Sequence, residues 1–369
     1  MNKCNFLSGF LLFFLVILIS NISQADVATG GTHSIAIKND GTLWAWGGNK
    51  EGNLGVGGND DQDSPVLVGK DSDWKSISAG AHHTVAIKED GTLWAWGHNK
   101  SGELGDGTTI NRNTPVQVKG HSNWTFVIAG TGMTFGIKDD GSLWAWGDNR
   151  FGLYLDGTRT KQTTPIQVMK NKKWKMLAIT RNFHLMLQQD GTLWAEGHNT
   201  SGLLGLGHKR RIYAPKVISE DKWEYIASSR SHTLGIKKDG TLWGWGINSY
   251  GVLGDGTEEN RSTPTQIGTD TDWISVSTGF NASVGLKSNK TLWAWGNPGI
   301  DLKGKGIFEN QLHPTQVGTD SDWKSISARF SHTLAEKEDG SIWSWGMTNH
   351  LGKLGIGKRM ESTSPMKVF

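Results

Sequence analysis

The sequence predicts an all-β fold, a seven-bladed β-propeller with four-stranded blades. A Trp-containing segment recurs seven times at almost constant spacing, and no segment shows helical periodicity. Glycine supplies 50 of the 369 residues, about twice its usual share, as expected where many tight turns join short strands. Units of about 50 residues that each carry four strand-like segments are typical of propeller blades.

Tryptophan defines the repeat most clearly. A first Trp opens the same motif in all seven units, a second follows two residues later in six units, and a third marks another strand in six units. These three positions account for all 19 Trp residues. A side chain repeated at one place in every unit indicates a buried anchor rather than a sugar-binding or light-sensing surface. The first positions are Trp44, Trp94, Trp144, Trp194, Trp243, Trp293 and Trp343.

The second unit shows the four expected strands, at residues 74–79, 84–88, 92–97 and 116–118. Val85 and Ile87 alternate with their neighbours, which is the period of a strand. The pair Asp90-Gly91 separates the second strand from the third. It predicts a two-residue hairpin turn with positive φ at both positions.

The N-terminus has the pattern of a secretory signal peptide. Lys3 precedes an apolar run over residues 6–19, and small residues follow at Ser23 and Ala25. This pattern predicts cleavage before Asp26. An uncleaved anchor is the alternative, but the run is shorter than the about 20 residues that span a bilayer.

Cleavage would leave residues 26–369 as one propeller domain after a signal peptide at residues 1–25. Cys4, the single cysteine, precedes the apolar run, whereas a lipoprotein cysteine would follow it. We therefore expect a mature chain without lipid, disulfide or stable membrane anchor, exported to the periplasm or the medium.

The two ends of the mature chain suggest how the ring closes. Residues 27–30 align with residues 77–80, and the chain stops just after the proline strand at residues 365–368. We expect the N-terminal strand to pair with the C-terminal strand in one sheet. Such pairing would close the ring and remove an exposed sheet edge.

The repeated motif, clearest over residues 77–91 and 94–108, reads I-S-A-G-x-x-H-T-x-A-I-K-x-D-G and W-x-W-G-x-N-x-x-G-x-L-G-x-G-T. It resembles the regulator-of-chromosome-condensation repeat, and the resemblance covers residues 26–369. That family includes a nuclear exchange factor for a small GTPase, a plant UV-B photoreceptor and a secreted bacterial inhibitor of β-lactamase. The resemblance implies a propeller that binds another protein through one face.

The strand directions divide the ring into two faces. Face A carries the turns before the repeated His and the long loops such as 98–114, and face B carries the Asp-Gly hairpins. Face B is nearly uniform between units, whereas the two positions before the repeated His differ in every unit. Arg329 also replaces a turn glycine. These positions are Gly31-Thr32, Ala81-His82, Thr131-Gly132, Arg181-Asn182, Arg230-Ser231, Phe280-Asn281 and Phe330-Ser331.

Charge is uneven around face A. The long loop at 198–214 carries a net +3, whereas the loop at 48–64 carries −3. Arg210 and Arg211 lie in the basic loop, and Arg181 and Arg230 extend the same sector. A partner with an acidic patch suits this sector, and a solvated rim is the alternative.

Several other functions are disfavoured. The net charge of +3 gives no general attraction for nucleic acid, and no P-loop or nucleophile elbow is present. The repeated residues His33, His83, His232 and His332 lie in different units without metal-ligand spacing, which favours a structural role. Several units depart from the motif: Glu196 replaces a second Trp, and Glu336 replaces an alternating Ile. A buried carboxyl needs a partner or a raised pKa.

We therefore expect a monomeric, non-enzymatic propeller that binds another protein and holds no catalytic residue, metal or cofactor. The alternatives are an exchange-factor-like regulator of a host small GTPase and a propeller enzyme such as a lyase or glycosidase. The expected protein-binding residues are Phe280, Phe330, Arg181, Arg230, Arg329, His82, Arg210 and Arg211.

Overall fold

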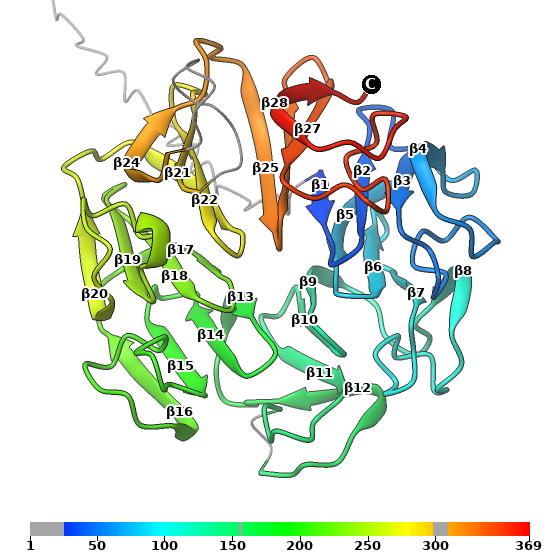
Figure 1. Ribbon diagram of the computed structural model, residues 1–369. Helices are drawn as coiled ribbons and strands as arrows, with labels where there is room; N and C mark the ends of the chain where they lie inside the picture. Colours follow the sequence, from blue (N-terminus) through cyan, green and yellow to red (C-terminus); the bar gives the residue numbers. More distant parts are fainter. Residues whose placement is uncertain (1–25, 155–156, 298–308) are drawn as a thin grey trace, which may run out of the picture.

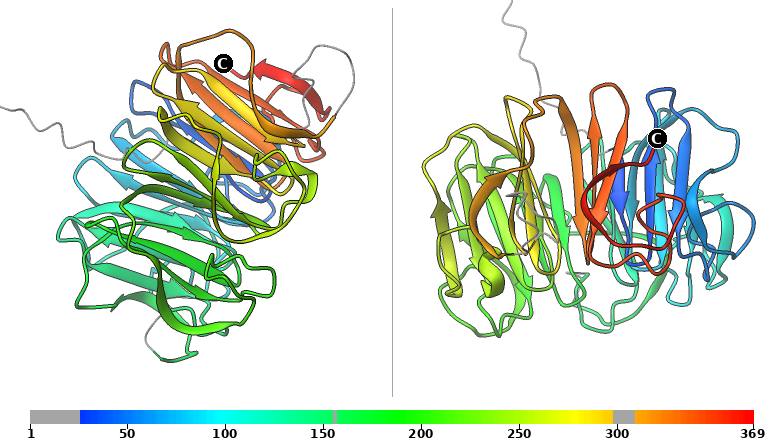
Figure 2. Two further views of the ribbon diagram at one scale, coloured as in Figure 1. Left: turned by 90° about the vertical axis from the view of Figure 1, so that its left-hand side faces the viewer. Right: turned by 45° about the horizontal axis from the view of Figure 1, so that its top comes forward.

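The computed structural model describes residues 26–154, 157–297 and 309–369, so the signal peptide expected at residues 1–25 lies outside the described part. The chain forms seven four-stranded antiparallel sheets around a central axis, which confirms the predicted propeller (Figure 1). The strands run between two faces of the ring, where the turns and loops gather (Figure 2). Over the described ranges, no helix is long and apolar enough to cross a membrane.

Each blade uses consecutive strands, numbered here in chain order. Blades 1 to 3 contain β1 (Val27–Thr29), β2 (His33–Ile37), β3 (Leu43–Gly47) and β4 (Gln62–Leu67); β5 (Trp74–Ala79), β6 (His83–Lys88), β7 (Leu93–Gly97) and β8 (Arg112–Gln117); and β9 (Trp124–Ala129), β10 (Met133–Lys138), β11 (Leu143–Gly147) and β12 (Gln162–Val168).

Blades 4 and 5 contain β13 (Trp174–Ile179), β14 (Phe183–Gln188), β15 (Leu193–Gly197) and β16 (Ile212–Ser219); and β17 (Trp223–Ser228), β18 (His232–Lys237), β19 (Leu242–Gly246) and β20 (Arg261–Ile267), with the short 3-10 helix η1 (Ser249–Gly251) before β20. Blades 6 and 7 contain β21 (Trp273–Thr278), β22 (Ala282–Lys287), β23 (Leu292–Gly296) and β24 (Gln311–Gln316); and β25 (Trp323–Arg329), β26 (His332–Lys337), β27 (Ile342–Gly346) and β28 (Ser362–Lys367). The expected strands of the second unit are confirmed, although its fourth strand begins earlier, at Arg112.

The hairpin between the second and third strands differs from the predicted two-residue turn. In blade 2 the loop spans residues 89–91, and the Gly91 nitrogen donates to the Lys88 carbonyl at 2.9 Å. Gly91 has a φ of 74°, while Asp90 is not among the residues with positive φ. A turn followed by one left-handed glycine forms a three-residue hairpin with a bulge, so only one position needs positive φ.

A hydrogen-bonded chain explains why Asp-Gly-Thr-Leu-Trp repeats as a block. The Asp90 carboxylate accepts from the backbone nitrogen and the hydroxyl of Thr92, at 2.9 and 2.7 Å. The Thr92 hydroxyl oxygen in turn accepts from Trp94 Nε1 at 3.0 Å. The turn thereby fixes the indole of a half-buried Trp on the following strand.

The second Trp and the repeated His join neighbouring blades. Trp96 is fully buried, and its Nε1 donates to the Asn53 carbonyl of blade 1 at 3.0 Å. Thr84 donates to the same carbonyl at 2.9 Å, and its hydroxyl lies 2.8 Å from His33 Nε2. His33 is completely buried. The predicted structural role of the repeated His is therefore confirmed at this interface.

The ring does not close by pairing the two terminal strands, so that expectation is wrong. The strand β1 pairs with β2, and β28 pairs with β27. The chain begins at the innermost strand of one blade and ends at the outermost strand of another, so each sheet is complete within its own unit. Side chains close the ring instead: the Thr29 nitrogen donates to Ser327 Oγ at 3.0 Å, and Phe369 packs 5.9 Å from Trp44.

Candidate functional site

Face A of the structure is built as the strand directions predict. The turns that follow the inner strands lie beside the long loops, since the His98 nitrogen donates to the His82 carbonyl at 2.9 Å. The turns of some neighbouring blades are also bonded to one another, as the Gly31 nitrogen donates to the Gly80 carbonyl at 3.0 Å. Face A thus has a firm framework on which the variable side chains are displayed.

Two phenylalanines and an arginine form one patch across blades 5 to 7 of face A. Phe280 and Phe330 are half-buried and pack edge to face, with ring centroids 4.8 Å apart. The Arg230 guanidinium lies 5.9 Å from the Phe280 ring and is exposed. The structure thereby brings together three of the residues that the sequence predicted for binding.

Phe330 has an uncommon backbone conformation. Its φ is 56°, in the left-handed region that a bulky residue adopts at a cost of about 1–3 kcal/mol. Its carbonyl accepts from the Phe280 nitrogen at 2.8 Å, which ties this conformation to the neighbouring turn. Backbone strain of this kind concentrates at functional sites.

Arg329 does not present its guanidinium to a partner as expected. Its Nη1 donates to the carbonyls of Ala79 and Ala129, at 2.6 and 2.9 Å. These carbonyls end β5 and β9, so the Arg329 side chain reaches from blade 7 across the face A end of the axis to blades 2 and 3. Burial lowers the Arg329 pKa to about 10, which leaves it charged at neutral pH. The Arg329 side chain is therefore held across the ring by hydrogen bonds to two inward-facing carbonyls.

A basic pocket of about 300 Å³ lies at blades 3 to 5 of face A and shares Arg230 with the phenylalanine patch. Arg181, Arg211 and Arg230 line it from three separate segments of the chain. Its other lining residues are Phe151, Asn182 and His198. Arg210 is exposed and His82 lies in blade 2, so neither of these two predicted residues contributes to the pocket.

Phe151 and His198 were not predicted from the sequence as site residues, and the sequence identified Asn182 only as a variable turn position. The signal available was the departure of the fourth unit from the motif, where Phe183, His184 and Glu196 replace a His, a Thr and a Trp. His184 and Glu196 are direct cross-strand partners on β14 and β15, and both are buried. They take the place of the Thr–Trp pairs that join other blades.

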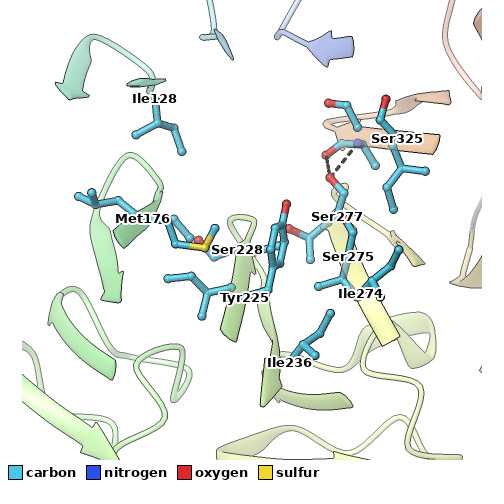
Figure 3. A pocket seen from close by; sticks show the side chains of 18 of the residues that line it. Ile128, Met176, Tyr225, Ser228, Ile236, Ile274, Ser275, Ser277 and Ser325 are labelled. Atoms are coloured by element: carbon cyan, nitrogen blue, oxygen red, sulfur yellow. Dashed lines mark hydrogen bonds between the residues drawn. The ribbon is translucent and has the colours of Figure 1, made fainter. Parts of the chain in front are cut away.

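A second cavity, of about 620 Å³, lies on the axis of the ring, where the inner strands surround it. Figure 3 shows Ile128, Met176 and Tyr225 extending into it from blades 3 to 5, with Ser277 and Ser325 of blades 6 and 7 on the other side. Some of these serines already serve the fold, since the Ala328 nitrogen donates to Ser277 Oγ at 2.9 Å. The lining of the axial cavity thus mixes apolar side chains with hydroxyls and with charged groups such as Glu224 and Lys237.

The two carboxyls with raised pKa values do not line the axial cavity. Burial raises the Glu196 pKa to about 8, and the nearby Arg211 charge opposes the shift. Burial also raises the pKa of Glu336, whose carboxylate accepts from Lys324 and Ser325 at 2.9 Å each. In the described part of the chain, no group of three or more His, Cys, Asp or Glu side chains is arranged to hold a metal ion.

Comparison with known families matches the repeats directly. The regulator of chromosome condensation (RCC1) repeat matches residues 40–87, 90–137 and 239–286. A second description of the same repeat matches residues 25–53, 74–103 and 223–252. Among curated proteins, the ultraviolet-B receptor UVR8 of Arabidopsis thaliana is 42% identical over 59 residues. That match spans 16% of this chain and 13% of the receptor's length.

Solved structures share the fold over most of the chain. Prp20p of Saccharomyces cerevisiae superposes with a TM-score of 0.78 at 22% identity, covering 94% of this chain and 86% of Prp20p. Human WBSCR16 gives a TM-score of 0.76 at 20% identity, covering 89% of this chain and 94% of WBSCR16. At these identities the likeness is one of fold. The yeast study describes binding of Prp20p to Gsp1p and histones.

Proposed function

We propose that this propeller, which contains RCC1 repeats, works by binding another protein through face A and catalyses no reaction of its own. Similar rings bind proteins: Prp20p binds Gsp1p and histones, and a further yeast structure shows Prp20 with Kap60. The shared scaffold supports a binding role, while the partner must be set by the side chains that differ between blades.

The strained patch at Phe280 and Phe330 carries the proposal. Two large apolar rings remain half-exposed beside a cation, and one of them is held with a φ of 56°. The corresponding turn residues of other blades, such as Ala81, are not among those with positive φ. In blade 7 the strand pairing extends to Arg329 and His332, and the two-residue turn that remains places Phe330 at positive φ. Aromatic and Arg side chains are the residues most often responsible for binding energy at protein interfaces.

Among the described residues, the one carboxylate that lines the axial cavity is Glu224, and its pairing with Lys175 at 2.5 Å favours binding over catalysis. Arg329 occupies the face A end of the axis, and neither Glu196 nor Glu336 lines the axial cavity, although Glu336 accepts from Lys324 and Ser325, which do. Glu196 and Glu336 belong to blades 4 and 7, so they do not form the paired carboxylates of general acid–base chemistry.

Alanine variants of the patch test the proposal. The protein captures its partner from the producing culture or from candidate host extracts, and the dissociation constant of the purified pair is then measured. Phe280→Ala and Phe330→Ala should each weaken binding by about 1–2 kcal/mol, mostly through faster dissociation.

The matched control is Ile274→Ala, because Ile274 is an apolar side chain that is 52% exposed and lies at the face B end of β21. Charge reversal of Asp71 or Asp270 is a poorer control, since these residues pair with Lys88 and Lys287. If Ile274→Ala abolishes binding while both phenylalanine variants bind normally, face A is not the binding surface.

A further inference from the structure

The basic pocket of face A lacks a counter-ion of its own. Its residues Arg181, Arg211 and Arg230 form no ion pair with a carboxylate, and no carboxylate lines the pocket, over the ranges the structure describes. Four other arginines behave differently, with carboxylate oxygens at 2.6 to 2.8 Å. These paired residues are Arg112, Arg150, Arg261 and Arg359.

The long loop of blade 4 shows how this imbalance arises. In blade 2 the equivalent loop is closed by Arg112, whose Nε donates to Asp106 at 2.9 Å, and blade 5 repeats the pair. In blade 4 the corresponding positions hold Leu206 and Ile212, so the internal ion pair is missing. The loop instead carries Arg211, at a position where blade 2 has Asn111.

Arg211 is held in place but its charge is not matched. Its Nη2 donates to the Phe151 carbonyl at 3.1 Å, and its guanidinium lies 4.9 Å from the Tyr213 ring. Its Nε is buried and has no hydrogen-bond partner among the described residues. A buried unsatisfied donor costs about 1–3 kcal/mol, which an acceptor arriving with a ligand would recover.

The neighbouring carboxyl does not neutralise the pocket. The Glu196 pKa of about 8 keeps most of this group protonated at pH 7, so it adds little negative charge near Arg211.

The turn of blade 4 is not tied to the turns beside it by a backbone hydrogen bond within the described ranges, unlike the turns of blades 1 and 2. Arg181, on this turn, is exposed and can adjust to a ligand.

We propose that this pocket binds an acidic side chain, glutamate or aspartate, of the partner that docks on face A. The inference rests on the proposed function and adds the chemistry that the partner must offer. Planar guanidinium groups bind a carboxylate through paired hydrogen bonds, and the unpartnered Arg211 Nε supplies one donor. The Phe151 wall suits the methylene groups that carry a carboxylate, and a volume of about 300 Å³ exceeds the needs of a bare anion.

Short peptides test the pocket without the natural partner. The probes are a blocked tetrapeptide with two glutamates, the same peptide with two glutamines, and inorganic phosphate. Binding to the purified protein is measured by calorimetry and by NMR of the arginine Nε–H groups. We expect the glutamate peptide to bind at least about tenfold more tightly than the glutamine peptide and to shift the Arg211 signal.

Charge-matched variants locate the binding. Arg211→Gln and Arg181→Gln should each weaken the glutamate peptide about tenfold, while Arg210→Gln, in the same loop but outside the pocket, should change it less than about twofold. Arg181 is exposed, so its variant separates ligand binding from any loss of folding at Arg211. Equal losses in all three variants would show general attraction to a basic surface and overturn the pocket.

The phosphate probe and the captured partner provide further tests of the proposal. Tighter binding of inorganic phosphate than of the glutamate peptide would overturn the acidic side chain as the ligand. The same conclusion would follow if the glutamate peptide showed no binding at a concentration of about 10 mM, because a weaker affinity would not be specific recognition. A captured partner that tolerates Arg181→Gln and Arg211→Gln but not Phe280→Ala overturns the pocket and retains face A binding. A partner that tolerates all of these variants overturns the proposed function itself.

Discussion

At the scale of single residues, the two buried carboxyls differ in how their burial is compensated. Glu336 has a cation and a hydroxyl within hydrogen-bonding distance, at Lys324 and Ser325. One oxygen of Glu196 is buried without a hydrogen-bond partner among the described residues. Burial without a close counter-charge favours the neutral acid, so Glu196 couples the stability of blade 4 to pH.

Glu196→Gln should remove this pH dependence. The pKa of Glu196 is raised from 4.5 to about 8 in the folded protein, so the folded state binds the proton more tightly than the unfolded state. The stabilisation is fully present below pH 4.5 and is lost as the pH rises through about 8. We expect the free energy of unfolding of the wild type to fall relative to the variant by a few kcal/mol over that interval, as an order of magnitude.

Urea unfolding of both proteins at several pH values between 5 and 9 measures this difference. Because Glu336 is present in both proteins, its own titration cancels in the comparison. If the free energies of unfolding of the wild type and the variant differ by a constant amount from pH 5 to pH 9, Glu196 does not bind a proton more tightly in the folded state than in the unfolded state.

At the scale of elements, the long loops and the strands of the next blade fit each other closely. Gly55, in the loop of blade 1, has a φ of 76°, and a β-carbon there would lie 2.7 Å from Trp96 Nε1 of blade 2. A β-carbon at Gly105 would crowd Nε1 of Trp146 in the same way. The sequence departs from this pairing once, where Leu155 takes the glycine position and Glu196 takes the Trp position of the next unit. Leu155 itself lies outside the described residues.

Gly55→Ala should therefore destabilise the protein more than Gly69→Ala. Both glycines have positive φ, 76° and 68°, but Gly69 has no atom within 4 Å of the added β-carbon. Each substitution carries a left-handed strain of about 1–2 kcal/mol, and crowding against Trp96 should add about 1–3 kcal/mol at Gly55. Denaturant unfolding of the two variants checks the difference, and equal losses would show that the indole can move away.

At the scale of the whole molecule, the ring depends on the contact between its last blade and its first. The C-terminal residue Phe369 packs on Trp44 and Trp46 of blade 1, at 5.9 and 6.0 Å, while its carbonyl accepts from the Ile342 nitrogen of blade 7. Lys38 lies 4.0 Å from the same ring. One aromatic residue thus touches both sides of the closing interface.

Deleting residues 365–369 should open this interface. The deletion unpairs part of β28 from β27 and removes the ring that covers Trp46, so we expect aggregation or a markedly lower thermal midpoint. Phe369→Ala keeps the strand and should cost about 1–3 kcal/mol, which separates the aromatic contact from the strand pairing. Size-exclusion chromatography and thermal unfolding measure both effects. A truncated protein that remains monomeric with an unchanged midpoint would contradict the importance of this closure.

The sequence by itself determined the number of blades, the strands within them and the structural tryptophans, although the first Trp of each unit is half-buried and only the second and third are buried. These features follow from short-range rules, because alternation, turn residues and a constant spacing act within one unit of about 50 residues. It also identified face A and the positions on it that vary, including Phe280, Phe330 and Arg181.

Only the tertiary structure decided which of those side chains meet and which are used by the fold. Arg329 looks like its exposed neighbours in sequence, yet carbonyls 250 and 200 residues away draw it across the axis. Arg181, Arg211 and Arg230 converge on one pocket, while Arg210, next in the chain to Arg211, does not. The direction of a side chain depends on acceptors and free volume that other blades supply, and no local pattern encodes these before the ring is closed.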